Sequence, residues 1–335
     1  MSFQNTLHRA YGPIGYQADF KAFPEDFQVN EALGVSPSGS GEHLLLRIRK
    51  TSQNTHWVAK LLAEYVGVSE KDVGYCGRKD RHAITTQWFS LYMPKQQQQL
   101  LTQTDRQWHD FKPDGVELLE QHWHKQKLRR GVHQANHFKI RLRSVCKLNA
   151  QEALTTQDKL QLAEKLNQIT KSGVPNYFGE QRFGREGKNL ESAQKWFAQN
   201  QKPSRREKSM ILSSARSYLF NRVLAQRVAD NNWDQLIEGD VPLDSKPSGP
   251  LWGRGRSAAM DDALTYEQQV LAPWAQWCDG LEHQGLQQER RSLVLRPNDF
   301  TYGWDQDDLI VEFALSPGQF ATAVLAELVK LNQAY

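Results

Sequence analysis

Cysteine is scarce in this sequence of 335 residues, which contains only Cys76, Cys146 and Cys278. The three lie far apart, form no CxxC pair and are odd in number. A disulfide framework and a zinc knuckle are therefore both disfavoured as organising features of the fold. The same pattern favours a reducing compartment, and we expect the protein to reside in the cytoplasm.

Long apolar runs are also missing. The longest stretch without Asp, Glu, Lys or Arg is 313–326, which Pro317 and Gly318 interrupt, so we expect no membrane span. Residues 1–10 lack the apolar centre of a signal peptide, and we expect none. Charged residues make up 24% and hydrophobic residues 39% of the chain. That composition excludes wholesale disorder, and the length indicates roughly two domains of about 150 residues each.

Motifs of several enzyme classes are absent. Residues 184–189 (GREGKN) lack the spacing of a phosphate-binding loop, and 253–256 (GRGR) is not a dinucleotide fingerprint. The sequence contains no HExxH and no GxSxG, and no candidate serine nucleophile accompanies Asp80 and His82. These absences disfavour P-loop enzymes, dinucleotide-binding enzymes, zinc proteases and serine hydrolases.

Acidic residues are absent from 121–150, which we call the acid-free segment, although the whole chain has 42 Lys and Arg against 38 Asp and Glu. The eight cations of this segment are Lys125, Lys127, Arg129, Arg130, Lys139, Arg141, Arg143 and Lys147. Such a one-sided stretch, with Trp123 and Phe138 interleaved, indicates an RNA or DNA backbone as partner. The alternative is a solvated sheet face neutralised by acids from elsewhere in the fold. Its histidines lack nearby carboxylates, so we expect no metal site.

Apolar patterns locate most of the elements. Alternation predicts strands at 42–50 and 136–145, and further strands are predicted at 73–76, 86–93, 292–296 and 308–315. Helical spacing predicts helices at 158–172, 189–199, 208–230 and 266–278, the last interrupted by Pro273. A further helix is predicted to start at Asn54 or Thr55. A final helix, reaching Leu331, is predicted with Ser316 as its cap and Pro317 at its first position.

Strands predominate in the early and late parts of the chain, and helices predominate in the middle. We therefore expect a discontinuous domain of about 1–173 and 295–335, interrupted by an inserted domain. Residues 240–261 are rich in Gly, Pro and Ser and are expected to form a loop.

One short stretch, 77–85 (GRKDRHAIT), carries a chemical pattern. It places Asp80, its single carboxylate, among Arg78, Lys79 and Arg81 in a loop between two predicted strands. Nearby cations favour an ionised carboxylate and lower its pKa, and an ionised carboxylate can act as a nucleophile or an electrostatic stabiliser. The same cations can hold phosphates on either side of a nucleotide. The alternative is a surface hairpin with a salt-bridged aspartate.

With that loop identified, the sequence resembles the tRNA pseudouridine synthase D (TruD) family over nearly its whole length. The motifs that carry the resemblance are 21–27 (KAFPEDF) with Val29 and Glu31, 41–44 (GEHL), 77–83 (GRKDRHA), 136–138 (NHF), 174–184 (VPNYFGEQRFG) and 317–322 (PGQFAT). Any one of these motifs alone is weak evidence, whereas their order and spacing together make a specific match.

The resemblance implies that the chain isomerises uridine to pseudouridine in tRNA, at uridine 13 for bacterial members. It also implies an α+β fold with two parts. A pseudouridine-synthase-like catalytic domain, 1–173 and 295–335, has a mixed, largely antiparallel sheet and a central cleft. A helix-rich α/β TRUD domain, 174–294, is inserted into it. The reaction has no redox step and releases no group, so no cofactor and no metal are required.

By the same resemblance, Asp80 is the catalytic aspartate, and Phe27, Asn136 and Phe320 bind the substrate nucleotide. Attack of Asp80 on the ribose C1′ and addition to C6 of the uracil both remain open. The Asn136 amide can pair with a donor and an acceptor of a uracil edge, whereas a core position is the alternative for each phenylalanine. Lys21 is a candidate charge partner of Asp80, the alternative being an exposed lysine before a strand.

We expect a monomer that binds tRNA and neither DNA nor a membrane. The competing hypothesis is a non-catalytic RNA-binding or RNA-chaperone protein on the same scaffold. Both hypotheses predict tRNA affinity that falls steeply with salt, but only the enzyme requires the Asp80 carboxylate. A methyltransferase is disfavoured, because no glycine-rich loop follows a predicted strand.

Overall fold

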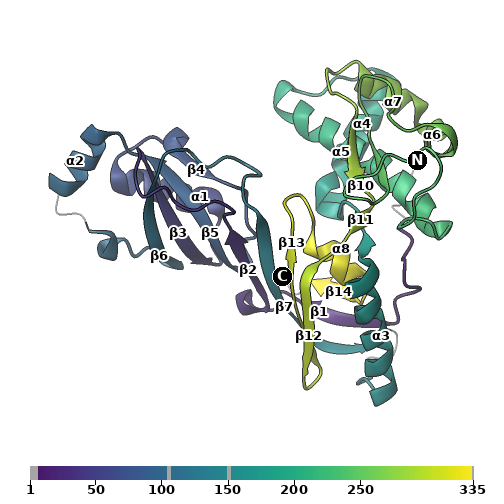
Figure 1. The fold of residues 1–335 in the computed structure, drawn as a ribbon, viewed down its shortest axis with the longest axis horizontal. Helices are drawn as coiled ribbons and strands as arrows, with labels where there is room; N and C mark the ends of the chain where they lie inside the picture. The colour runs from purple at the N-terminus through teal and green to yellow at the C-terminus, as the bar shows by residue number, and fades with distance from the viewer. Residues whose placement is uncertain (1–6, 104–106, 149–151, 334–335) are drawn as a thin grey trace. The chain divides into compact units, whose positions relative to one another are not determined.

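The computed structural model describes residues 7–103, 107–148 and 152–333 (Figure 1). The chain forms two compact units, each assembled from three separate stretches. The first, which we call the helical unit, comprises Met1–Ile14, Leu160–Arg296 and Phe320–Leu328. The second, which we call the sheet unit, comprises Gly15–Lys159, Pro297–Gln319 and Val329–Tyr335. Packing defines these units, so the expected division into a catalytic and an inserted domain stays a prediction.

The sheet unit is built on a ten-stranded sheet. Its strands are β1 (Tyr16–Phe20), β2 (Phe27–Ala32), β3 (His43–Thr51), β4 (Val73–Tyr75), β5 (Ile84–Tyr92), β6 (Val116–His124), β7 (Ala135–Lys147), β12 (Asn298–Asp305), β13 (Asp308–Leu315) and β14 (Lys330–Gln333). The main path follows the order β12-β13-β7-β2-β5-β3-β6. β2 runs parallel to β5 and β1 parallel to β14, whereas the other pairs are antiparallel. A mixed, largely antiparallel sheet was predicted and is confirmed.

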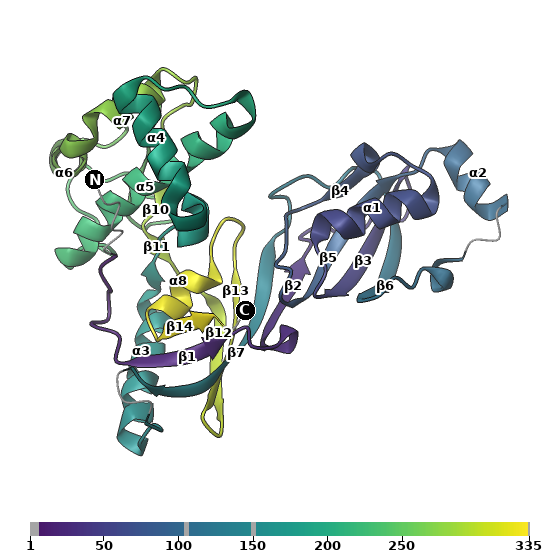
Figure 2. The ribbon, with the colours of Figure 1, turned by 180° about the vertical axis from the view of Figure 1, so that it is seen from behind.

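Local signals explain the first helix and the sheet face that it covers. Helix α1 (Thr55–Val66) starts after Asn54, whose side-chain oxygen accepts a hydrogen bond from the His56 backbone N–H at 2.9 Å, as expected of an N-cap. The helix lies against β3–β5 (Figure 2). Its apolar face packs with the inward side chains of β3, and each fully buried aliphatic side chain contributes about 1.5–3 kcal/mol.

Smaller helical segments complete the sheet unit. They are α2 (Lys95–Gln103) and the 3₁₀ turns η1 (Pro24–Asp26), η2 (Glu70–Asp72) and η3 (Trp108–Asp110). Helix α3 (Thr156–Ser172) begins in the sheet unit and continues into the helical unit. Gly173 follows the end of α3 with φ 83°. Glycine is favoured there because it adopts the left-handed conformation after a helix without steric cost.

The helical unit has its own core. Its helices are α4 (Lys188–Gln199), α5 (Arg205–Ala229), α6 (Asp261–Leu271), α7 (Ala275–Glu282) and α8 (Ala321–Ala326), with the 3₁₀ turns η4 (Glu180–Phe183), η5 (Arg185–Gly187) and η6 (Ala272–Trp274). Two small sheets pair β8 (Val174–Pro175) with β11 (Val294–Leu295) and β9 (Ser248–Leu251) with β10 (Glu289–Ser292). The predicted break at Pro273 is confirmed by η6, which separates α6 from α7. Tyr177, Phe178 and Phe183 are buried in this core.

Two sequence predictions are wrong. The segment 240–261 contains a strand, β9, where a loop was expected. Pro250 is tolerated there because β9 pairs with a single neighbour, β10. The final helix does not run from Ser316 to Leu331: α8 starts after Phe320 and ends at Ala326, and Leu331 lies in β14 beside Ala18 of β1. Apolar residues at helical spacing cannot reveal that a distant strand edge pairs with the end of the segment.

The fold is mixed α+β, as predicted. None of the helices in the described ranges is both long and apolar enough to cross a bilayer.

Candidate active site

Asp80 lies in the loop between β4 and β5, and its partner comes from a distant part of the sequence. Its side chain is 45% exposed, and its Oδ2 atom lies 3.3 Å from the Nζ atom of Lys21. The Lys21 side chain is only 5% exposed. A nearly buried ammonium therefore lies directly beside the predicted catalytic carboxylate, which confirms Lys21 as its charge partner.

Lys50 holds the same loop through a hydrogen bond to its backbone. It is fully buried in β3, and its Nζ atom donates hydrogen bonds to the backbone oxygens of Asp80 at 2.8 Å and Gln53 at 2.7 Å. The pKa of Lys50 is lowered to about 8, because burial outweighs the charge of Asp80, which raises it, and the charge of Lys79 also lowers it. No sequence prediction named Lys50, although it continues the buried face of β3 after Leu46 and Ile48.

The cations next to Asp80 in sequence have other partners. The Lys79 ammonium pairs with the buried carboxylate of Glu31, and Arg81 donates from Nε to the Ser52 carbonyl at 3.4 Å. Among the described residues, the ion pair of Asp80 is made by Lys21. Successive side chains of a loop point in different directions, so the expected cluster of sequence neighbours is replaced by a partner from the turn before β2.

Phe27 supports Lys21 from the first position of β2. It is 3% exposed, and the Lys21 Nζ atom lies 4.0 Å from the centroid of its ring, which is cation–π distance. Phe138 of β7 lies against the same ring, with centroids 5.9 Å apart. Phe27 therefore packs in the core beneath the ion pair, and its contact with a substrate stays a prediction.

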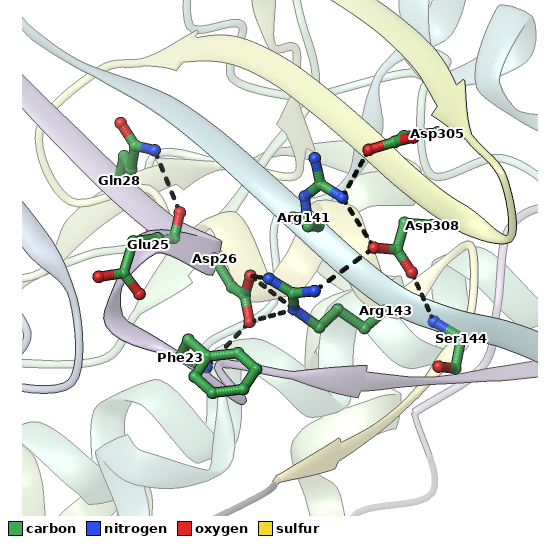
Figure 3. A network of polar contacts seen from close by, with 9 residues as sticks. All are labelled: Phe23, Glu25, Asp26, Gln28, Arg141, Arg143, Ser144, Asp305 and Asp308. Atoms are coloured by element: carbon green, nitrogen blue, oxygen red, sulfur yellow. Dashed lines mark hydrogen bonds and ion pairs between the residues drawn. The ribbon is translucent and has the colours of Figure 1, made fainter.

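A polar network fixes the turn that joins Lys21 to Phe27 (Figure 3). Asp26 is 1% exposed and accepts hydrogen bonds from the Phe23 backbone N–H at 2.9 Å and from Arg143 Nε at 2.8 and 2.9 Å. Asp308 extends the network, because it accepts hydrogen bonds from Arg141 at 2.8 Å and from the Ser144 backbone N–H at 2.9 Å. Since β7 supplies both arginines, the turn is tied to the centre of the sheet.

Asn136 lies on β7 opposite Glu31 of β2. Its Nδ2 atom lies 3.0 Å from Nε2 of His133, and its Oδ1 atom is buried without a hydrogen-bond partner. Glu31 in turn pairs with Lys79, the residue before Asp80. The β2–β7 strand pair and this ion pair therefore connect Asn136 to the loop that carries Asp80. The structure thus brings Asp80, Phe27 and Asn136 into one connected region of the sheet unit.

Phe320 belongs to the helical unit, directly before α8. Its ring packs against Phe178, with centroids 6.2 Å apart. The other three predicted site residues belong to the sheet unit, so the contact of Phe320 with a substrate stays a prediction. Phe178 belongs to the motif 174–184, and its backbone N–H and C=O form two hydrogen bonds of 2.9 Å with the Asn221 amide.

The acid-free segment divides into two halves. On β7 its cations are neutralised by acids from elsewhere, in the pairs Lys139–Glu312, Arg141–Asp305, Arg141–Asp308, Arg143–Asp26 and Lys147–Asp158. In the preceding loop, Lys125, Lys127, Arg129 and Arg130 form no ion pair with an acid of the described chain. They line two hollows of about 490 and 510 Å³. Residues 149 and 150 of the segment lie outside the described residues.

Glu31, Cys76 and His133 form a buried set of possible metal-ligand atoms, all within 4.8 Å of one another. The Glu31 carboxylate already accepts hydrogen bonds from Lys79 and from the Trp88 backbone N–H, the latter at 3.1 Å. Burial raises the pKa of the Cys76 thiol to about 12, which disfavours the thiolate that binds metals. These residues fit a hydrogen-bonded core cluster better than a metal centre.

Known proteins are similar to this chain in sequence and in fold. A family model described as tRNA pseudouridine synthase D (TruD) matches residues 6–202. A Cellvibrio japonicus protein named tRNA pseudouridine synthase D is 48% identical over 333 residues, which cover 98% of this chain and 94% of the relative. An Aeromonas salmonicida protein with the same name is 39% identical, with 98% and 95% covered. A crystal structure of a Methanosarcina mazei protein, whose description carries the TruD name, superposes with a TM-score of 0.72 at 20% identity and covers 98% of this chain and 97% of that one.

Proposed function

The chain belongs to the tRNA pseudouridine synthase D family, and from this membership we propose that it isomerises uridine 13 of tRNA with Asp80 as its catalytic aspartate. That it is a tRNA pseudouridine synthase, an isomerase, follows from the family itself. The position of the uridine and the role of Asp80 are our proposals. The single observation that best supports the role of Asp80 is the Lys21–Asp80 ion pair, which holds the carboxylate of the loop between β4 and β5 against a buried cation. The position of the uridine rests on the family resemblance.

The reaction explains why a carboxylate is needed. The N1–C1′ bond of the nucleotide breaks, the uracil turns, and a C5–C1′ bond forms. C5 loses its proton and N1 gains one, so the product is an isomer of the substrate. The Asp80 oxygen either bonds to C1′ as N1 departs with the electron pair and is displaced when C5 attacks C1′, or adds to C6 and is released from C6 after the N1–C1′ bond has broken and the C5–C1′ bond has formed. In both routes the ammonium of Lys21 orients the carboxylate and balances its charge before attack.

The target base must leave its stack before Asp80 can reach it. Unstacking costs a few kcal/mol, and stacking on aromatic rings in a pocket offsets part of that cost. We propose that Phe27 and Phe320 line the nucleotide and that Asn136 pairs with the uracil edge. The buried, unpartnered Oδ1 atom of Asn136 supports this role, because it lacks a donor in the free protein.

The tRNA backbone requires cations that are not already neutralised. Lys125, Lys127, Arg129 and Arg130 meet this requirement, whereas the paired cations of β7 do not. We propose that the loop containing 125–130 contacts phosphates of the tRNA. The division into a catalytic part (1–173 and 295–335) and an inserted part (174–294), the cytoplasmic location and the monomeric state remain proposals as well.

The proposal is tested by incubating the protein with unmodified tRNA transcripts and mapping pseudouridine chemically. We expect a single new pseudouridine at position 13. A pseudouridine at another position would disprove the assignment of the site while leaving the isomerase activity intact. Binding of the transcripts with no pseudouridine formed would instead support the RNA-chaperone alternative.

A further inference from the structure

His133 and Asn136 make a buried contact that the chemistry above does not use. His133 lies in the loop between β6 and β7, is 8% exposed, and has its Nε2 atom 3.0 Å from Nδ2 of Asn136. An amide nitrogen carries only donors, so the ring nitrogen that faces it must accept. With the amide in this orientation, the contact requires a neutral imidazole whose proton is on Nδ1, a buried atom that has no hydrogen-bond partner among the described residues.

The surroundings of His133 keep the ring neutral. Burial lowers the pKa of His133, and the Lys79 ammonium lowers it further, while the Glu31 carboxylate raises it. Cys76, the third neighbour, accepts a hydrogen bond from the His133 backbone and has a thiol whose pKa burial raises to about 12, so it carries no charge at neutral pH. A neutral ring has one acceptor nitrogen, and the facing Nδ2 atom of Asn136 assigns that role to Nε2.

This contact determines which way the Asn136 amide points. With Nδ2 bound to His133, the remaining polar atom of the side chain is Oδ1, which is buried and has no hydrogen-bond partner. Leaving a buried acceptor without a donor is unfavourable. A ligand that brings an N–H group to this atom relieves that cost, whereas a ligand that brings another acceptor does not.

The two pyrimidine bases of RNA differ in whether their N3 atom is a hydrogen-bond donor or an acceptor. Uracil carries a hydrogen on N3 and is a donor there, whereas N3 of cytosine is an acceptor. We propose that His133 is a positioning residue that selects uridine over cytidine, because it holds the Asn136 amide with its oxygen free to accept the N3–H of the target base. The inference rests on the proposed role of Asn136 in the substrate site and adds the residue that sets its specificity.

The test compares two tRNA transcripts that differ only by uridine or cytidine at the modified position. Dissociation constants are measured in an Asp80→Asn background, in which neither transcript reacts, with His133, His133→Leu or His133→Gln. We expect His133→Leu to free the amide to rotate and to lower the preference for uridine about tenfold, which corresponds to one hydrogen bond of about 1.4 kcal/mol. His133→Gln can place its side-chain oxygen where Nε2 lies, and it should retain the preference.

A merely structural role for His133 would weaken both transcripts equally and leave the ratio unchanged, and that result would overturn the inference. Thermal melting of each variant identifies unfolded protein, and His133→Phe, which keeps the ring volume, replaces His133→Leu if the latter does not fold. Failure of the underlying function is visible separately, because the wild-type protein would then form no pseudouridine in tRNA. An active wild-type protein with an unchanged ratio in the variants would contradict this inference, together with the role of Asn136 on which it rests, and would leave the isomerase activity intact.

Discussion

Lys21 places its ammonium nitrogen 3.3 Å from a carboxylate oxygen of Asp80, across 59 residues of sequence. The lysine has a positive φ of 58° and lies over the ring of Phe27, and the network around Asp26 fixes the turn that follows it. One side of the predicted active site is therefore built before any substrate arrives.

Replacing Lys21 by Met should slow the chemical step. Charge-assisted contacts contribute about 1.5–3 kcal/mol, so we expect the single-turnover rate at saturating tRNA to fall about ten- to hundredfold. Arg81→Met is the matched control, because Arg81 is next to Asp80 in sequence but bonds to the Ser52 carbonyl. Equal reductions in both variants would show that general loop charge, and not the Lys21 pair, supports the reaction.

Asp26→Asn should destabilise the sheet unit. The change weakens the hydrogen bonds of a buried carboxylate with Arg143 and with the Phe23 N–H, and we expect the free energy of unfolding in urea to fall by about 1–3 kcal/mol. Glu117→Gln is the control, because its pair with Arg49 is exposed on both sides and exposed pairs contribute about 0–1 kcal/mol. If Asp26→Asn lowers the free energy of unfolding no more than Glu117→Gln does, the Asp26 network does not stabilise the sheet unit.

Lys50 should make stability depend on pH in the alkaline range. Its pKa falls from 10.5 in an unstructured chain to about 8 in the fold, so between these values the unfolded chain binds more protons. The free energy of unfolding of the wild type should then rise with pH, relative to Lys50→Met, by about 3 kcal/mol from pH 8 to pH 10.5. If the free energies of unfolding of the wild type and Lys50→Met change equally with pH, the lowered pKa of Lys50 is contradicted. Lys60→Met, which changes an exposed lysine, is the control and should show the pH dependence of the wild type.

The loop 125–130 should account for part of the salt dependence of tRNA binding. Each phosphate that a variant no longer neutralises reduces the slope of log K against log salt by about 0.7–0.9. We expect Arg129→Ala and Arg130→Ala to weaken binding and to flatten that slope, as measured by filter binding between about 50 and 200 mM salt. Lys139→Ala, which removes a cation already paired with Glu312, should change the slope much less, and an equal effect would contradict the proposed surface.

Local patterns predicted the elements whose signals are local. Alternation placed β3 and β7, and Asn54 marked the start of α1, because side-chain period and capping act within a few residues. The strand β14 was mistaken for helix, since only its distant partner β1 makes it a strand. Family resemblance supplied the predicted site residues, and pattern alone gave no more than an aspartate among cations.

The supporting residues of the site could be found only in three dimensions. Lys50 and Glu31 do carry a signal, because each continues the buried face of its own strand. His133 carries none, since its importance comes from the atom of Asn136 that it faces. The pairing of Lys21 with Asp80 likewise depends on how the turn and the loop meet, which no local spacing records.

The central claim is that the Asp80 carboxylate performs the isomerisation. The most direct measurement compares wild type and Asp80→Asn for pseudouridine formed in a tRNA transcript, with the dissociation constant for tRNA measured alongside. We predict that Asp80→Asn forms no pseudouridine yet binds tRNA about as tightly as the wild type, because one exposed carboxylate contributes little to phosphate contacts. Pseudouridine formation by Asp80→Asn at the wild-type rate would contradict it.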